Sequence, residues 1–386
     1  MELNKIIYLD HHATTPVDPR VLEVMLPYFT EVYGNAASID HEYGFVAKQA
    51  VDKAREQIAK AFNAQPEEII FTSGATESNN IAIFGVAEKY VDKGKHIITC
   101  VTEHKAVLDC CKKLETQGYL VTYLPVDQYG LVDLELLEKS ITKETILISI
   151  MAANNEIGTI APLQEIGAIA KKYGIIFHTD AAQAVGHIPI DVQKMNIDVL
   201  SVSGHKIYGP KGIGVLYRRK SNPRINLSPV IYGGGHEKGL RSGTLNVPAI
   251  VGIGKAIELA LKEMRTDSSR YKELITLIYT TLKAEFPEIV LNGHPEQRLS
   301  HNLNISIPGV ESKALIVQLK DIAISAGSAC TTTSTEPSHV ISALGFGEER
   351  AHNAIRISVG RKTTKDQIFT ATDIILETIK KIRELV

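Results

Sequence analysis

The sequence Ser-Val-Ser-Gly-His-Lys-Ile-Tyr-Gly-Pro-Lys-Gly-Ile-Gly-Val-Leu occupies residues 201–216 of a chain of 386 residues. An apolar run over residues 199–202 has the length of a buried strand, and Lys206 follows it among small and hydroxylated residues, directly after His205. Burial in a crowded turn lowers the pKa of a lysine and favours the neutral amine, which condenses with an aldehyde cofactor such as pyridoxal phosphate. The alternative is a solvated lysine at a strand end.

A second polar signal lies upstream, where residues 175–183 read Ile-Ile-Phe-His-Thr-Asp-Ala-Ala-Gln. Asp180 stands at the carboxyl end of an apolar strand, the edge at which open α/β sheets place their chemistry. A carboxylate there can keep the nitrogen of a pyridine ring protonated. Asp180 is followed, roughly 25 residues later, by Ser-x-x-Lys at the end of another strand, and this combination is a specific signal for such a cofactor.

Strands and helices alternate through the first two thirds of the chain. Apolar runs predict strands over residues 96–101, 119–124, 145–151 and 175–180, and helical periodicity predicts helices over 42–64 and 163–173. This alternation predicts a mostly parallel sheet covered by helices on both faces, with the active site along one rim.

The last third predicts a smaller α/β domain. A helix over residues 248–284 leads to predicted strands at 289–291, 303–307, 323–325 and 354–359 and to a closing helix at 364–385. We predict a large cofactor-binding domain over residues 16–257 and a small domain formed by residues 1–15 and 258–386.

The amino-acid composition indicates which kinds of binding partner and which cellular compartment to expect. The chain is 44% hydrophobic and 22% charged, with a net charge of −2 and scattered basic residues, so neither nucleic acid nor an anionic membrane is an expected partner. No apolar run approaches the roughly 20 residues of a membrane span, and the amino terminus lacks a targeting pattern. We expect a cytoplasmic protein with reduced thiols, because four cysteines are too few for a disulfide framework.

Two motifs could indicate a metal site and a dinucleotide-binding site, but the residues around them do not support either function. His11 and His12 are adjacent, but neighbouring side chains point in different directions and no cysteine or carboxylate spacing supports a metal site. The glycine-rich stretch 209–214 precedes a strand, whereas a dinucleotide-binding loop follows a strand and opens a helix. We therefore expect neither a metal nor a nicotinamide dinucleotide.

A phosphate site is predicted where a strand, a glycine turn and a helix start succeed one another. Residues 68–80 read Glu-Ile-Ile-Phe-Thr-Ser-Gly-Ala-Thr-Glu-Ser-Asn-Asn. Free backbone amides at a helix amino terminus, together with the Thr76 hydroxyl, form a cradle for a phosphate group. A plain helix cap is the alternative, since serine and threonine are favoured there in any case.

These motifs together resemble a known family. Residues 180–183 (Asp-Ala-Ala-Gln) followed by 203–212 (Ser-Gly-His-Lys-Ile-Tyr-Gly-Pro-Lys-Gly) are similar to the class V, fold-type I pyridoxal-phosphate enzymes, and most similar to the cysteine desulfurases of the NifS/IscS type. The resemblance implies an α/β fold with a mostly parallel seven-stranded sheet covered by helices in the large domain. It also implies a homodimer whose cofactor sites are shared between subunits.

The resemblance assigns roles to individual residues. Lys206 holds the cofactor, Asp180 contacts the pyridine nitrogen, Gln183 contacts the phenolic oxygen, and His104 stacks on the ring and exchanges protons. Asn155 contacts cofactor and substrate, and Arg356 binds the substrate carboxylate, a role that suits its planar guanidinium. The predicted phosphate ligands are Ala75, Thr76, Ser203, His205 and, in the neighbouring subunit's site, Thr244.

A single cysteine stands apart from the others. Cys100, Cys110 and Cys111 lie in or beside apolar segments and are predicted to pack, whereas Cys330 lies in Ser-Ala-Gly-Ser-Ala-Cys-Thr-Thr-Thr-Ser-Thr-Glu-Pro, residues 325–337. So polar a stretch cannot bury apolar area, which predicts a mobile surface loop with an accessible thiol. Without family context, an incidental loop cysteine is the alternative; the resemblance makes Cys330 the sulfur-accepting nucleophile and separates this chain from the SufS-type branch, which has a shorter loop.

The implied activity is the removal of sulfur from L-cysteine, giving L-alanine and a persulfide on Cys330. The persulfide sulfur would pass to an acceptor or scaffold protein for iron-sulfur cluster assembly or other sulfur-containing cofactors. The chain stops soon after its last helix, so docking of a scaffold by an extended tail is not expected. Two alternatives remain: a class V aminotransferase or selenocysteine lyase with the same cofactor, and an interaction protein that kept the fold without the chemistry.

Overall fold

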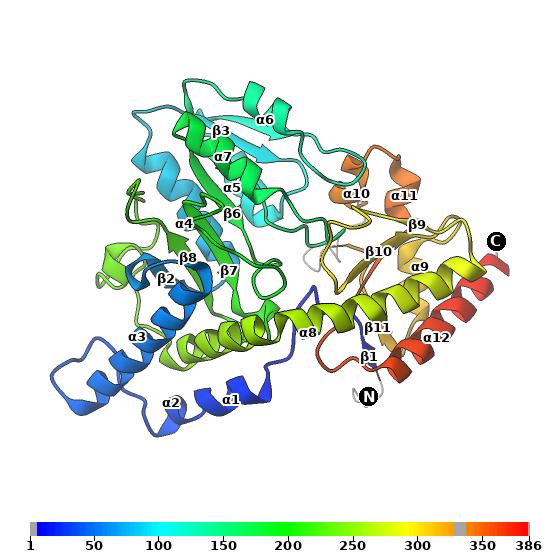
Figure 1. Cartoon of the computed structure of the whole chain (residues 1–386), viewed down its shortest axis with the longest axis horizontal. Coiled ribbons are helices and arrows are strands. Elements are labelled where there is room, and N and C mark those ends of the chain that lie inside the picture. Colours follow the sequence, from blue (N-terminus) through cyan, green and yellow to red (C-terminus); the bar gives the residue numbers. More distant parts are fainter. Residues whose placement is uncertain (1–5, 328–336, 385–386) are drawn as a thin grey trace.

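The protein is described by a computed structural model that covers residues 6–327 and 337–384. Its apolar side chains gather on both faces of a large central sheet and, separately, around a smaller set of strands. The helix α8 (Val247–Glu285) runs beneath both parts and joins them (Figure 1).

The central sheet has seven strands in the order β2-β8-β7-β6-β5-β3-β4. Strand β8 is antiparallel to both of its neighbours, and the other neighbouring pairs are parallel. The strands are β2 (Ile69–Thr72), β3 (His96–Cys100), β4 (Leu120–Leu124), β5 (Thr145–Ser149), β6 (Ile176–Asp180), β7 (Val199–Ser203) and β8 (Gly214–Arg218). The predicted fold class, a mostly parallel seven-stranded sheet in an α/β protein, is confirmed.

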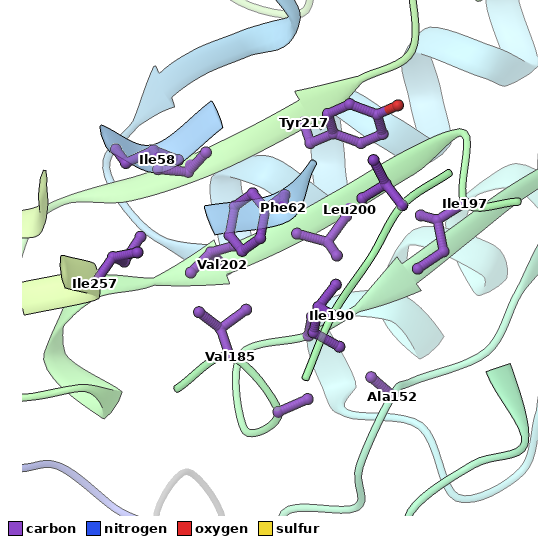
Figure 2. Close-up of a cluster of buried hydrophobic side chains, with 14 of the residues drawn as sticks. Ile58, Phe62, Ala152, Val185, Ile190, Ile197, Leu200, Val202, Tyr217 and Ile257 are labelled. Atoms are coloured by element: carbon purple, nitrogen blue, oxygen red, sulfur yellow. The ribbon is translucent and has the colours of Figure 1, made fainter. Parts of the chain in front are cut away.

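Helices cover both faces of this sheet, which explains why its strands are apolar along their whole length. Alternate strand residues point to opposite sides: Phe177 belongs to the core beneath α3, α7 and α8, whereas Ile176 belongs to the core beneath α4 and α5. Figure 2 shows part of the first core, where Phe62 and Ile58 face Val202 and Leu200 of β7.

Helices alternate with the strands of the large part from β2 to β6, after three helices that precede the large sheet. They are α1 (Pro19–Met25), α2 (Pro27–Thr30), α3 (Glu42–Phe62), α4 (Ala75–Lys89), α5 (Lys105–Glu115), α6 (Leu134–Lys139) and α7 (Leu163–Tyr173). The predicted helix over 42–64 ends two residues early, because Asn63 adopts a left-handed conformation with φ 56° and caps the last turn.

The smaller part contains two short sheets. Strands β9 (Val290–Leu291), β10 (Asn302–Ser306) and β12 (Ala354–Ser358) form an antiparallel sheet in the order β12-β10-β9, and β1 (Ile7–Tyr8) pairs in parallel with β11 (Ile322–Ala323). Helix α12 (Lys365–Glu384) packs along α8 (Figure 1). Three short helices escaped prediction: α9 (Ser312–Gln318), α10 (His339–Ala343) and α11 (Glu348–His352).

The first strand belongs to the smaller core although it begins the chain, since Leu9 packs among residues of β10, β12 and α12. Helix α8 continues without interruption through residue 257, where the domain boundary is predicted. That boundary stays a prediction. Within the described ranges, no helix combines the length and apolar character needed to cross a membrane.

Candidate active site

A cavity of about 500 Å³ opens at the carboxyl ends of β6 and β7, on the side that faces the smaller sheet. It collects side chains from strand ends, from the start of α4, from the loop after β5 and from β12. The predicted site residues that line it are Ala75, Thr76, His104, Asn155, Asp180, Gln183, Ser203, His205, Lys206 and Arg356.

Lys206 ends the single helical turn Gly204–Lys206 (η3) that follows β7. Its Nζ donates to the backbone carbonyl of His12 and, at 3.0 Å, to that of Ala13. Gln183 Nε2 donates to the same His12 carbonyl at 3.0 Å. The lysine amine is therefore held at a defined place in the cavity by the loop that follows β1.

Asp180 is the last residue of β6 and only 6% exposed. Asn79 Nδ2 on α4 donates to Asp180 Oδ2 at 2.7 Å, and the backbone N–H of Ala182 donates to Oδ1 at 2.9 Å. Two donors fix the plane of the carboxylate and satisfy it as an anion. The strand end thus presents a rigid negative charge to the cavity.

At another part of the cavity wall, helix α4 begins without a capping side chain. Gly74 occupies the cap position, and a Cβ built there would meet nothing within 4 Å. The first backbone N–H groups of a helix have no intrahelical acceptor, so this wall offers donors and a positive helix end to an anion.

His205 also lines the cavity, and its ring is neutral. Burial, with Lys206 and Lys211 nearby, lowers its pKa to about 4. Its Nδ1 lies 3.1 Å from the Thr14 hydroxyl, and its backbone carbonyl accepts from the Thr15 hydroxyl at 2.9 Å. These contacts tie the turn that carries Lys206 to the segment after β1.

His104 caps helix α5, and its Nδ1 accepts the backbone N–H of Ala106 at 3.1 Å. An Nδ1 that accepts a hydrogen bond carries no proton, so the neutral ring holds its proton on Nε2. The cap therefore selects one tautomer for a histidine that lines the cavity.

Arg356 reaches the cavity from β12 of the smaller sheet and is only 1% exposed. Its Nη1 donates to the Asn155 carbonyl at 2.8 Å, and its Nη2 pairs with Asp10 Oδ1 at 2.9 Å. Its Nε has no hydrogen-bond partner among the described residues. A buried guanidinium with a donor left over is suited to a carboxylate ligand.

Among the described residues, Thr244 is the predicted site residue that does not line this cavity. It is exposed, and its predicted role lies in a neighbouring subunit. The loop that carries Thr244 is tied to the start of α4, because Arg241 Nε donates to Glu77 Oε1 at 2.7 Å. Cys330 lies outside the described residues.

The other three cysteines are buried. Burial raises the pKa of Cys100 to about 11 and of Cys110 to about 12, and it raises that of Cys111 as well. A thiol that stays protonated at neutral pH is a poor nucleophile. Over residues 6–327 and 337–384, no three His, Cys, Asp or Glu side chains are grouped as metal ligands.

The sequence interpretation missed the residues that orient the predicted ones. Asn79 binds Asp180 across 101 residues of sequence, and Asp10 binds Arg356 across 346. No local pattern announces such partners, because neither residue lies near its partner along the chain.

The fold and this cavity define a class of protein. The class-V aminotransferase family model matches residues 7–370, and the chain belongs to this family. The class predicted from the motifs around Asp180 and Lys206 is thereby confirmed.

Relatives narrow the class further. The chain is 52% identical over 384 residues to the cysteine desulfurase IscS of Ehrlichia chaffeensis, covering 100% of this chain and 93% of that protein. A solved NifS-like protein is 39% identical with a TM-score of 0.91 and covers 97% of this chain and 100% of its own. A structure of SspA in complex with cysteine is 41% identical with a TM-score of 0.81, covering 92% and 98%. The predicted NifS/IscS type is confirmed.

Proposed function

We propose that this chain is a pyridoxal-phosphate-dependent cysteine desulfurase, which converts L-cysteine to L-alanine and leaves a persulfide on Cys330. The observation that carries the proposal is the gathering of Lys206, Asp180 and Arg356 around one cavity. Full-length similarity to a cysteine desulfurase supports the choice of reaction.

The lining of the cavity fits the cofactor. The uncapped start of α4 suits its phosphate, the anchored Asp180 carboxylate suits a protonated pyridine nitrogen, and Lys206 supplies the amine. Gln183 and His104 line the same space. When bound, pyridoxal phosphate supplies an electron sink that acidifies the α-proton of an amino acid.

The residues of the chain supply binding and proton transfer. Arg356 holds the α-carboxylate of cysteine, and its backbone and side-chain anchors keep the guanidinium in place. Lys206 Nζ would take the α-proton of bound cysteine. His104 lines the same cavity and would be the second group that exchanges protons there.

The sulfur step falls to Cys330. Its thiolate attacks the sulfur of bound cysteine, a sulfur–sulfur bond forms, and the bond between that sulfur and the substrate Cβ breaks. Cβ keeps the electron pair and would take up a proton equivalent to the one that left the Cys330 thiol. Lys206 would return the α-proton, so the carbon skeleton leaves as L-alanine. A thiolate is needed because a neutral thiol is a weak nucleophile.

The partners follow from the same proposal. The protein acts as a homodimer in which Thr244 serves the neighbouring site, and exposed apolar side chains at Phe29, Tyr33, Ile39 and Tyr232 support such an interface. The persulfide sulfur passes to an iron-sulfur scaffold or another acceptor. A cytoplasmic location stays a prediction from the sequence.

The first test measures alanine formed from L-cysteine, with and without a thiol reductant, by the wild type and by Cys330→Ala. We expect alanine and matching sulfide from the wild type with reductant, and loss of both in the variant despite bound cofactor. Alanine formation at the wild-type rate by the variant would overturn the role of Cys330. Pyruvate formation without alanine would favour a class V aminotransferase instead.

A second test addresses Lys206. Lys206→Ala should lose the visible absorbance of covalently held cofactor, because Lys206 supplies the amine that the carbonyls of His12 and Ala13 hold in the cavity. Absorbance that borohydride still fixes to the variant protein would contradict the assignment.

A further inference from the structure

The side chain of His12, one of the two adjacent histidines, is buried without a hydrogen-bond partner. The residue is 1% exposed, and neither ring nitrogen meets a donor or acceptor among residues 6–327 and 337–384. Each nitrogen of an imidazole ring can form a hydrogen bond, and a buried polar group without a partner costs free energy. Two such nitrogens on one ring point to a ligand that supplies a partner.

His12 lines the same cavity as Lys206 and Arg356. Its backbone carbonyl accepts Lys206 Nζ and, at 3.0 Å, Gln183 Nε2. Its backbone N–H donates to Ser358 Oγ at 2.9 Å, and Ser358 ends β12 two residues after Arg356. The backbone of His12 is therefore fixed between the turn that carries Lys206 and the strand that carries Arg356.

Stacking holds the ring of His12 in one orientation. Its plane lies 10° from that of the His301 ring, with 4.4 Å between the ring centroids. His301 in turn stacks on His187, with 3.9 Å between the centroids. The fold thus fixes where the His12 nitrogens lie before any ligand binds, which lowers the entropic cost of binding one.

The electrostatic surroundings of this ring favour an anion. Burial is the main cause that lowers the pKa of His12 well below its ordinary value, with His301, Arg356 and Lys206 as further causes. A neutral imidazole carries one N–H donor and one acceptor nitrogen. An N–H donor close to two cationic side chains suits a negatively charged acceptor.

Among the groups expected in the cavity, the substrate carboxylate fits this place best. Asp180 and the start of α4 are assigned to the pyridine nitrogen and the phosphate of the cofactor, whereas Arg356 is assigned to the carboxylate. Asp10, two residues before His12, pairs with Arg356 Nη2 at 2.9 Å. Within the described ranges Arg356 Nε has no hydrogen-bond partner either. Two neighbouring residues of the cavity wall therefore have unused hydrogen-bonding capacity.

We propose that the His12 ring donates a hydrogen bond to the α-carboxylate of the substrate held by Arg356, and so selects amino acids over amines that lack a carboxylate. The inference rests on the proposed function and adds a specificity-determining residue to its site. The carboxylate forms and breaks no bond in the reaction, so this hydrogen bond is present throughout. Its loss should raise KM and leave kcat nearly unchanged.

The experiment compares His12→Phe with a matched control, His301→Phe. The first variant keeps a flat ring in the stack but lacks both nitrogens, and the second changes the neighbouring ring, which is not among the described residues that line the cavity. We measure cofactor absorbance, Tm, and kcat and KM for alanine formation with a thiol reductant. His12→Phe should raise KM for L-cysteine about tenfold, the usual effect of one hydrogen bond to a charged group, and the control should keep the wild-type KM.

Two further variants of His12 separate the donor from the shape of the ring. His12→Gln keeps an N–H donor on a side chain of similar length, so its KM should lie closer to that of the wild type. His12→Ala removes the donor without adding bulk, and it replaces His12→Phe in the comparison if that variant loses cofactor or stability.

A pair of probes tests whether the carboxylate is the group that His12 recognises. L-alanine, the product, and ethylamine, the same skeleton without the carboxylate, are titrated into the cofactor-bound protein, and the change in cofactor absorbance reports binding. His12→Phe should lose about tenfold in affinity for L-alanine and nothing for ethylamine. In the wild type and in His301→Phe, the preference for L-alanine should be the same.

Three results would overturn the inference: a wild-type KM in both His12→Phe and His12→Ala, equal increases in His12→Phe and His301→Phe, or equal losses of affinity for L-alanine and ethylamine. A wild type that makes no alanine from L-cysteine would instead refute the proposed function, and the inference with it. Failure of the inference alone is recognised by an active wild type beside a His12→Phe variant with the same KM.

Discussion

At the scale of single residues, the candidate site depends on partners that hold the reacting groups still. Asp180 is oriented by Asn79 and by a backbone N–H, Lys206 by two carbonyls, and Arg356 by Asp10 and Asn155. Each of these anchors is buried or partly buried, so its removal leaves a polar group without a partner.

The Asn79 anchor gives a prediction. Asn79→Leu keeps the size of the side chain but removes the 2.7 Å hydrogen bond to Asp180. Losing a hydrogen bond to a charged group costs roughly 1.5–3 kcal/mol, so cofactor affinity should fall by roughly tenfold or more.

Titration of the cofactor-free protein with pyridoxal phosphate, followed by absorbance, measures this change. Glu88→Ala, which changes an exposed residue near the other end of the same helix, is the comparison. An affinity for Asn79→Leu equal to that of the comparison variant would show that the hydrogen bond does not support the cofactor site.

The sequence identifies functional residues that lie at the ends of strands. It does not identify the residues that form hydrogen bonds with them in the fold. Asp180 and Lys206 were predictable because they end apolar strands in an α/β pattern, where such folds place ligands. Asn79 and Asp10 were not, since their roles arise only when distant segments meet.

At the scale of elements, helices with a clear periodic pattern were predictable and five-residue helices were not. Helix α7 was predicted with its observed bounds, because eleven residues carry a clear periodic pattern. Helices α10 and α11 have five residues each, too few for a helical period to stand out. They form only because tertiary packing buries side chains such as Ile341 and Ala351.

Helix α8 is the element with the widest structural role, since its first half packs on the large sheet and its second half on the smaller core. Thr266, near its middle, is exposed. Thr266→Pro removes one intrahelical hydrogen bond and clashes with the preceding turn, which costs about 3 kcal/mol or more.

We expect Thr266→Pro to lower the free energy of unfolding in urea and also to raise KM for L-cysteine. The second effect follows because a kink would shift Arg356, in the smaller part, relative to Lys206. Thr266→Ala serves as control and should resemble the wild type in both measurements. If the alanine and proline variants behave alike, α8 does not set the relation between the two parts.

At the scale of the whole molecule, stacked rings of buried histidines connect segments of the large and the smaller part. The His301 ring stacks on His12 at 4.4 Å and on His187 at 3.9 Å between ring centroids. His12 precedes the large sheet, His187 follows β6, and His301 precedes β10. Burial is the main cause that lowers the pKa of all three, to about 4 for His187, and it lowers that of nearby His11 to about 4.

These shifts predict a loss of stability in mild acid. In the unfolded chain the histidines bind protons near pH 6.5, whereas in the folded protein His11 and His187 bind them only near pH 4. The unfolded state therefore gains protons first as pH falls, so stability is full above pH 6.5 and declines between pH 6.5 and 4. A shift of one pKa unit corresponds to about 1.4 kcal/mol of stability. The stability that depends on His11 and His187 remaining uncharged is therefore a substantial fraction of a typical free energy of unfolding.

Urea unfolding of the cofactor-bound protein at several pH values from 7.5 to 4.5 measures the slope. The double variant His11→Asn, His187→Asn removes two of the titrating rings and should show a shallower decline. Buried Glu103 has its pKa raised by burial and contributes in the opposite sense, losing stability as pH rises, so it does not produce the acid decline. A double variant with the wild-type slope would exclude His11 and His187 as the source of the decline.

The pairing of β1 with β11, and of Asp10 with Arg356 across 346 residues, also has a consequence for biosynthesis. A ribosome delivers β1 before the large sheet, and it delivers β11 and β12 only after every strand of that sheet has emerged. A nascent chain can thus complete the strand ends around Asp180 and Lys206 while Arg356 is still missing. The enzyme would be able to capture its cofactor before it can recognise an amino acid, and translation itself would delay the chemistry until the last strand arrives.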